Sequence, residues 1–250
     1  MKSAADSTSS RPVGAETMNS RLRDLYARYW STLAAAIPKN AHYSAPILIS
    51  ASEAYANADL RLMVVGQQTN TWWGADGWDA SLRESAPIDA LLRRYAEFEL
   101  GKAYPGPFWS AAHTLQRQLG SEGTRCGLIW SNLNRVDRAL SKKDPNARAT
   151  AIEEALGRIP LLEGEIRILQ PHVLIFFIGP AYDARLRATF PGVEVAKPTK
   201  REPLQRATHA NLAQFTFSTY HPNFLQRAKL LRRVLGDIVR TVRARPAERL

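Results

Sequence analysis

Three stretches of the sequence carry polar side chains suited to binding or cleaving a small organic group. They read Gly-Gln-Gln-Thr-Asn at 66–70, Asn-Leu-Asn-Arg at 132–135 and Tyr-His-Pro-Asn at 220–223. Their functional groups are mostly carboxamides, with one imidazole. Such groups can read a planar polar ligand by its hydrogen-bonding edge, and they can stabilise a leaving anion by donating hydrogen bonds to it.

The sequence lacks the motifs of several other common catalytic and binding sites. No Ser lies on a tight Gly elbow, and the phosphate-loop and dinucleotide glycine patterns are both absent. The one cysteine, Cys126, cannot form an internal disulfide or a four-thiolate cluster. Five histidines show no metal-ligand spacing: His42, His113, His172, His209 and His221. We therefore expect no metal and no organic cofactor.

The polar stretches follow short apolar runs that favour buried strands. Four such runs occur, at 60–66, 127–131, 172–179 and 214–219. Helical patterns separate them, so the sequence predicts an α/β fold with a three-layer α/β/α architecture and a short central parallel four-stranded sheet. Ligands in such folds bind at the carboxyl ends of the strands, which would bring the three polar stretches together.

The predicted helices are marked by apolar residues at helical spacing and by caps. They cover 20–37, 87–101, 107–119, a region from 150 to 170 that Pro160 kinks or splits, and 224–242. Residues 39–59 show no regular pattern. Residues 1–18 are rich in Ser, Thr and Ala and predict a disordered tail, which leaves 19–250 as a single domain.

The composition and charge of the chain indicate which binding partners and which cellular compartment to expect. Lys and Arg number 34 against 23 Asp and Glu, a formal net charge of +11 that favours a polyanionic partner. The longest apolar run, 173–178, is far shorter than the roughly 20 residues that a membrane-spanning helix needs. No apolar export signal follows the first residue, so we expect no membrane association and a cytoplasmic location.

Taken in order, these motifs resemble those of the uracil-DNA glycosylase superfamily. In that family the first strand ends in a motif related to Gly-Gln-Asp-Pro-Tyr, the second ends in an Asn, and the last leads into His-Pro-Ser-Pro-Leu. Here the corresponding segments are 66–70, Trp-Ser-Asn at 130–132 and His-Pro-Asn-Phe-Leu at 221–225. Gly-Pro-Phe-Trp at 106–109 lies where many members place a stacking aromatic. The resemblance spans about residues 60–240.

The resemblance implies a role for each matched residue. His221 would donate a hydrogen bond to the carbonyl of the departing base, and Asn132 would distinguish uracil from cytosine. Phe108 would stack under the ring, and backbone N–H groups near Gln67 and Gln68 would hold the other carbonyl. The extruded base leaves a gap in the DNA stack.

The DNA-contacting residues implied by the family follow the last strand. Leu225 would fill the gap in the stack, and Asn223 and Arg227 would also lie against the DNA. Basic residues on the last helix and in the segment 197–206 would contact phosphates.

Two positions depart from the family pattern. Gln68 stands where the family has a water-activating Asp, and Gln is not a base; it could position water with weaker activity or mark a changed substrate. Asn70 stands where the family has the Tyr that excludes thymine. The aromatic residues Trp72, Trp73 and Trp78 leave three interpretations open: a lid, a nucleic-acid stacking platform or ordinary packing.

We therefore expect a monomeric, monofunctional DNA glycosylase that hydrolyses the N-glycosidic bond of a flipped-out uracil or related deaminated base during base excision repair of DNA damage. One alternative is a catalytically weak module of the same fold that binds a base or nucleic acid without turnover. Another is a hydrolase or transferase of free nucleosides or nucleotides.

Overall fold

A mixed sheet forms the centre of the computed structural model, which describes residues 14–120, 123–141, 143–144 and 147–244. The six strands are ordered β2-β1-β5-β8-β7-β6. The first four are parallel, and β7 and β6 continue the sheet antiparallel. The strands are β1 (Leu60–Gly66), β2 (Cys126–Asn132), β5 (Val173–Phe177), β6 (Glu194–Val195), β7 (Leu204–Thr208) and β8 (Phe215–Thr219).

The α/β class and the four parallel strands are confirmed, but the expectation of a four-stranded sheet is wrong. The sheet has six strands because β7 and β6 extend it beyond β8. β6, the edge strand, is only two residues long, and β7, between β6 and β8, is partly exposed and has no buried apolar run. Arg206 of β7 lies over the rings of Phe215 and Phe217 on β8. This pairing depends on tertiary contacts that strand periodicity does not encode.

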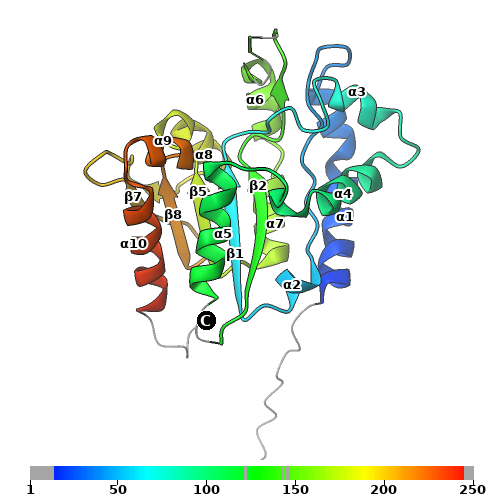
Figure 1. The fold of residues 1–250 in the computed structure, drawn as a ribbon. Coiled ribbons are helices and arrows are strands. Elements are labelled where there is room, and N and C mark those ends of the chain that lie inside the picture. Colours follow the sequence, from blue (N-terminus) through cyan, green and yellow to red (C-terminus); the bar gives the residue numbers. More distant parts are fainter. Residues whose placement is uncertain (1–13, 121–122, 142, 145–146, 245–250) are drawn as a thin grey trace, which may run out of the picture.

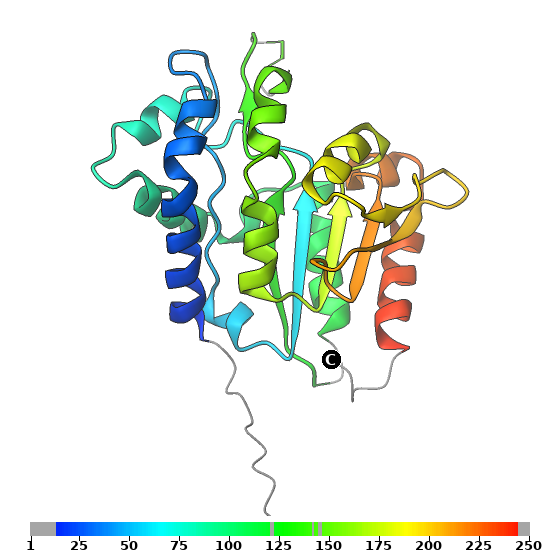
Figure 2. The same cartoon turned by 180° about the vertical axis from the view of Figure 1, so that it is seen from behind.

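Helices cover both faces of the sheet and complete three layers (Figures 1 and 2). On one side α5 (Pro107–Leu119) packs against β2 and against α10 (Leu231–Arg243). On the other side α7 (Leu161–Leu169) packs against α1 (Ala15–Ala36). The shorter helices are α2 (Glu53–Ala56), α3 (Gly77–Leu82), α4 (Pro87–Glu97), α6 (Thr150–Gly157), α8 (Asp183–Thr189) and α9 (Pro222–Arg227), with 3-10 turns η1 (Glu99–Gly101) and η2 (Pro180–Tyr182).

Two predicted boundaries need correction. Helix α1 begins at Ala15, so residues 15–18 are helical rather than part of a tail, and Met18 is buried in the core. Residues 1–13 of the expected tail lie outside the described residues. The last helix is broken into α9 and α10, with Lys229 between them in the left-handed region at φ +57°.

The segment without a regular pattern, 39–59, contributes to the core. Ala45, Ile47, Leu48 and Ile49 are almost fully buried although they lie outside any regular element. An extended segment that is buried on all sides shows neither a helical nor a two-residue period, so its sequence carries no signal of burial. A small hairpin, β3 (Asp137–Arg138) with β4 (Ala147–Arg148), follows β2 and stands above the sheet in Figure 1.

A buried ion pair joins the segment 39–59 to the rest of the fold. The guanidinium of Arg135 donates two hydrogen bonds to the carboxylate of Glu165 on α7, both at 2.6 Å. The side chains are 5% and 0% exposed. Arg135 also donates to the carbonyl of Ile47, and the hydroxyl of Tyr26 on α1 donates to Glu165.

None of the helices in the described part of the chain has the length and apolar character that a bilayer crossing requires.

We expect Arg135→Ala to lower the free energy of unfolding by about 3–5 kcal/mol, because it leaves the Glu165 carboxylate buried without a cation. Urea denaturation measures the loss. The matched control is Glu154→Gln, which removes the exposed Arg158–Glu154 pair on α6 and should leave the midpoint almost unchanged. Similar losses in both variants would contradict the role given to the buried pair.

Candidate functional site

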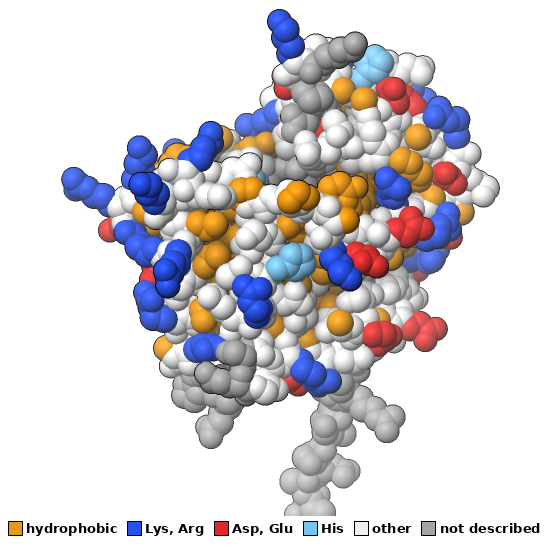
Figure 3. Space-filling model, viewed as in Figure 1, with side chains coloured by type: hydrophobic (Ala, Val, Ile, Leu, Met, Phe, Trp, Pro, Cys, Tyr) orange, Lys and Arg blue, Asp and Glu red, His pale blue; other side chains and the backbone are white. Residues whose placement is uncertain are grey.

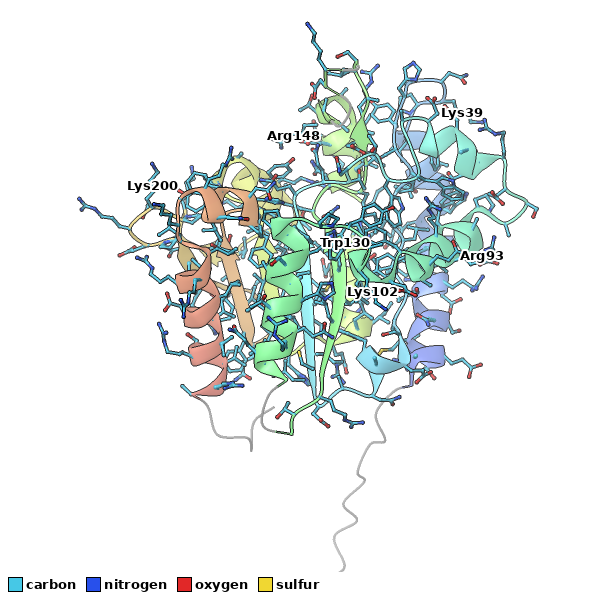
Figure 4. The ribbon with its side chains drawn as sticks, viewed as in Figure 1. Lys39, Arg93, Lys102, Trp130, Arg148 and Lys200 are labelled. Atoms are coloured by element: carbon cyan, nitrogen blue, oxygen red, sulfur yellow. The ribbon has the colours of Figure 1, made fainter. Side chains whose placement is uncertain are left out.

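A cavity of about 1190 Å³ opens at the carboxyl ends of β1 and β2. Figure 3 shows hydrophobic side chains around a hollow in the face of the molecule turned to the viewer. In Figure 4, in the same view, Trp130 of β2 lies near the middle of that face. Eight of the nine predicted site residues line this one cavity: Gln67, Gln68, Asn70, Phe108, Asn132, His221, Asn223 and Arg227.

His221 is held in one orientation by the start of α9. The backbone N–H of Asn223 donates to Nδ1 of His221 at 3.2 Å, so the imidazole acts as the N-cap, and Pro222 follows at the first turn, where no N–H is needed. Burial lowers the pKa of His221 to about 4. The ring is therefore neutral at pH 7, and because Nδ1 accepts a hydrogen bond, Nε2 carries the proton.

Asn132 ends β2 with its side chain 2% exposed. The indole Nε1 of Trp130, two residues earlier on the same side of the strand, donates to Oδ1 of Asn132 at 3.2 Å. An indole can only donate, so this bond fixes which way the amide points. Nδ2 is buried and has no partner among the described residues. A buried donor left unpaired is costly, which indicates a place for a ligand acceptor.

Gly66, Phe108 and Asn132 meet at the end of β1. A Cβ on Gly66 would overlap Oδ1 of Asn132 and would lie 3.2 Å from the ring of Phe108. Only glycine therefore leaves room for both side chains. The Phe108 ring is nearly parallel to the imidazole of His221, with centroids 5.7 Å apart and an interplanar angle of 20°. The aromatic face, the imidazole and the amide thus belong to one wall.

The two glutamines after β1 differ in their contacts. Nε2 of Gln67 donates to the carbonyl of Ile178 at 2.7 Å, so this side chain ties the loop to the end of β5. Oε1 of Gln68 accepts from the hydroxyl of Tyr182 at 2.8 Å. Burial raises the pKa of Tyr182 to about 12, which keeps the hydroxyl protonated as a donor. The guanidinium of Arg148 lies 4.5 Å from the centre of the Tyr182 ring and packs it in place.

The loop after β1 is anchored below the cavity by a buried carboxylate. Asp137 accepts from the hydroxyl of Thr69 at 2.6 Å and from the backbone N–H of Thr71 at 2.8 Å. Its own backbone N–H donates to Ser44 of the buried segment. The anchor leaves Asn70, between these two residues, exposed at the rim of the cavity.

The expectation for Leu225 needs correction. Its side chain is fully buried, so it is not at the surface where it could enter a DNA stack. Neighbouring residues of a helix point about 100° apart, and the residues of α9 that line the cavity are Asn223, Phe224 and Arg227. The ring of Phe224 stacks on Tyr220 with centroids 4.3 Å apart. Asn134 and Arg135 also turn away from the cavity, toward Glu153 and Glu165.

Aromatic residues that carry no obvious motif form much of the cavity wall. Trp130 is packed edge-on by Trp72 and Trp109, with centroids 5.7 Å and 5.0 Å away. The three tryptophans that follow β1 differ. Trp72 is in this cluster and Trp73 is half-buried at the rim, whereas Trp78 lies on α3 in the core, where its indole N–H donates to the carbonyl of Ile37. In the sequence, the Trp-Ser-Asn motif could have pointed to Trp130 as a cavity residue, whereas no motif pointed to Tyr182.

The acid and base groups at the cavity are few. Among the described residues, the carboxylates that line it are Glu97 and Glu99, both exposed on the outer rim. In the described part of the chain, no three His, Cys, Asp or Glu side chains lie together as a metal site would require. No protein-family model matches the chain, and no curated protein matches it either, so we interpret the site from its geometry.

The lowered pKa of His221 predicts a pH dependence of stability. The unfolded chain takes up a proton near pH 6.5, whereas folded His221 does so only near pH 4. Between these values the unfolded state binds more protons, so stability falls as the pH falls. From pH 7 to pH 5 the parent should lose about 1–2 kcal/mol more than His221→Gln. Urea denaturation at both pH values tests this, and equal losses would contradict it.

Proposed function

We propose that this protein is a monofunctional DNA glycosylase that hydrolyses the N-glycosidic bond of a flipped-out uracil or related deaminated base, as a step of base excision repair. One observation supports this above the others. A neutral imidazole that donates through Nε2, on His221, and an unpaired amide donor, on Asn132, lie on one cavity wall beside the ring of Phe108.

The donors suit the charge that develops in this reaction. As the glycosidic bond lengthens, the sugar takes on oxocarbenium character and negative charge builds on the base oxygens. A neutral His221 can donate to such an oxygen without first losing a proton. The aromatic side chains around these donors lower the local polarity, which strengthens the hydrogen bond as the charge grows.

The orientation of Asn132 supports a preference among bases. Its Oδ1 accepts from Trp130, and Nδ2 is the group left for a ligand. An amide N–H pairs with the O4 carbonyl of uracil, whereas the amino group of cytosine at the same position would place donor against donor. The buried Nδ2 would then stay unpaired, which disfavours cytosine.

A second function, binding with little turnover, is favoured by the contacts of Gln68. Among the residues that the structure describes, no carboxylate lines the inner cavity to activate water, and Oε1 of Gln68 already accepts from Tyr182. Stabilisation of the departing base by His221 and Asn132 would then be the main contribution to rate. We therefore expect slow hydrolysis rather than the rate of an enzyme with a general base.

An incision assay on a uracil-containing oligonucleotide, with alkali to cleave the abasic site, tests the proposal. The parent should give the cleaved product. His221→Ala and Asn132→Ala should each lower the single-turnover rate by about 10²–10³, the usual effect of removing a donor to a developing oxyanion.

Two control variants change the same residue types away from the cavity. His42→Asn and Asn57→Ala alter exposed residues and should cleave like the parent. Binding of the oligonucleotide without any product from the parent would favour the binding module. Parent-like rates in both cavity variants would show that these residues do not form the active site.

A further inference from the structure

The cavity is larger than one base requires. Its volume of about 1190 Å³ exceeds the roughly 300–1,000 Å³ of pockets that enclose a whole drug-sized ligand. Phe108, Asn132 and His221 account for the inner part only. The outer parts are lined by aromatic residues on two opposite elements, the loop before α5 and the start of α9, and they are open to solvent.

Tyr104 forms the first outer surface. Its side chain is 57% exposed, and Leu140 is the other large apolar side chain as exposed as this in the described part of the chain. The Tyr104 ring packs on Phe98 with centroids 5.0 Å apart, and Phe98 packs in turn on Trp130. The aromatic wall therefore continues from the buried partner of Asn132 out to solvent. An exposed aromatic face at a cavity mouth marks a contact surface.

The loop that carries Tyr104 is built to hold it in place. Leu100 and Gly101 both adopt left-handed conformations, at φ +52° and +68°, and a Cβ on Gly101 would overlap the indole of Trp109. The side chain of His113 hydrogen-bonds the carbonyl of Leu100, and the backbone N–H of Tyr104 donates to Gly101 at 2.8 Å. Left-handed backbone at a leucine is strained, and such strain collects at functional sites.

The second outer surface is the stacked pair of Phe224 and Tyr220. Phe224 lines the cavity, and the Tyr220 hydroxyl donates to the carbonyl of Pro198 at 2.8 Å, which ties the pair to the loop before β7. This side is strongly basic: Figure 3 shows Lys and Arg side chains gathered here, and Figure 4 places Lys200 on this loop. Its exposed basic residues include Lys197, Lys200, Arg201, Arg227, Lys229, Arg232 and Arg233.

The charges at the two outer surfaces differ. Near Tyr104, Glu97 and Glu99 lie beside Arg94 and Lys102, so positive and negative charges balance there. A phosphate gains little on that side, but a base can stack on the ring. Beside Phe224, Arg227 offers an exposed cation to a phosphate. A chain with alternating bases and phosphates offers a group suited to each surface.

We propose that the protein takes its target base from single-stranded DNA, with one flanking base stacked on Tyr104 and the other on Phe224. This rests on the proposed function. Stacking on an aromatic side chain contributes about 1–3 kcal/mol per base, whatever the base. A single strand needs no residue to replace an extruded base, and Leu225, the expected replacement, is buried. Extrusion also costs least where the base is unpaired.

Fluorescence anisotropy with a short labelled oligonucleotide that contains no uracil tests the proposal without requiring cleavage. The single strand should bind at least about fivefold more tightly than the same sequence in a duplex. Tyr104→Ala and Phe224→Ala should each weaken single-strand binding by roughly tenfold, whereas Tyr104→Phe keeps the ring and the affinity. Leu140→Ala is the matched control, because it removes an equally exposed apolar side chain that does not line the cavity.

The outcomes separate this proposal from the glycosylase function. Ring-dependent binding of the single strand without cleavage of uracil DNA would support the stacking surfaces and overturn the catalytic proposal. Equal affinity for duplex and single strand, or unchanged binding in both alanine variants with parent-like circular dichroism, would overturn the stacking proposal even if uracil were excised.

Discussion

The buried pair of Arg135 and Glu165 is the constraint on which the position of the site depends. Two charges removed from water are tolerated only with close partners, so the pair fixes α7, α1 and the segment around Ile47 against the turn after β2. In that turn, the backbone N–H groups of Leu133 and Asn134 donate to the carbonyls of Gly66 and Gln67. The loops that end β1 and β2 are therefore fastened to each other beside the ion pair. The two loops that carry the carboxamides cannot move independently.

A single pattern links the side chains of the inner cavity. In three polar ones an acceptor atom is already used by a donor of the protein itself: Trp130 donates to Asn132, Asn223 donates to His221, and Tyr182 donates to Gln68. For His221 and Asn132 this leaves N–H groups as the polar atoms available to a ligand. A wall that presents donors among aromatic rings favours a planar ligand rich in acceptors, and it favours that ligand more as it gains negative charge.

The parts of the fold that follow local rules could be predicted from the sequence, and the rest could not. Strand β1 and helix α5 have the predicted bounds, because a Gly ends the first and Pro and Gly flank the second. No period marks the short strands β6 and β7 or the buried segment around Ile47. At the site, the strand-end rule placed Asn132 and His221 on one cavity. Leu225 was misplaced because the rotation of α9 about its axis is set by packing, and Tyr182 and Tyr104 reach the cavity only through tertiary contacts.

Under the proposed function, two features favour the same kind of substrate: the Gln at position 68, which departs from the uracil-DNA glycosylase pattern, and the burial of Leu225, which matches that pattern in sequence. Gln68 supplies no base for water, and the buried Leu225 supplies no side chain to replace an extruded nucleotide. Pulling a base out of a duplex costs a few kcal/mol, which must come from binding energy that then cannot lower the barrier to cleavage. A site with weak water activation can least sustain that cost. A single strand removes it, and in our proposal the rings of Tyr104 and Phe224, which line the cavity, stack on its neighbouring bases. Under the proposed function, the Gln at position 68 and the burial of Leu225 are therefore both consistent with an unpaired substrate.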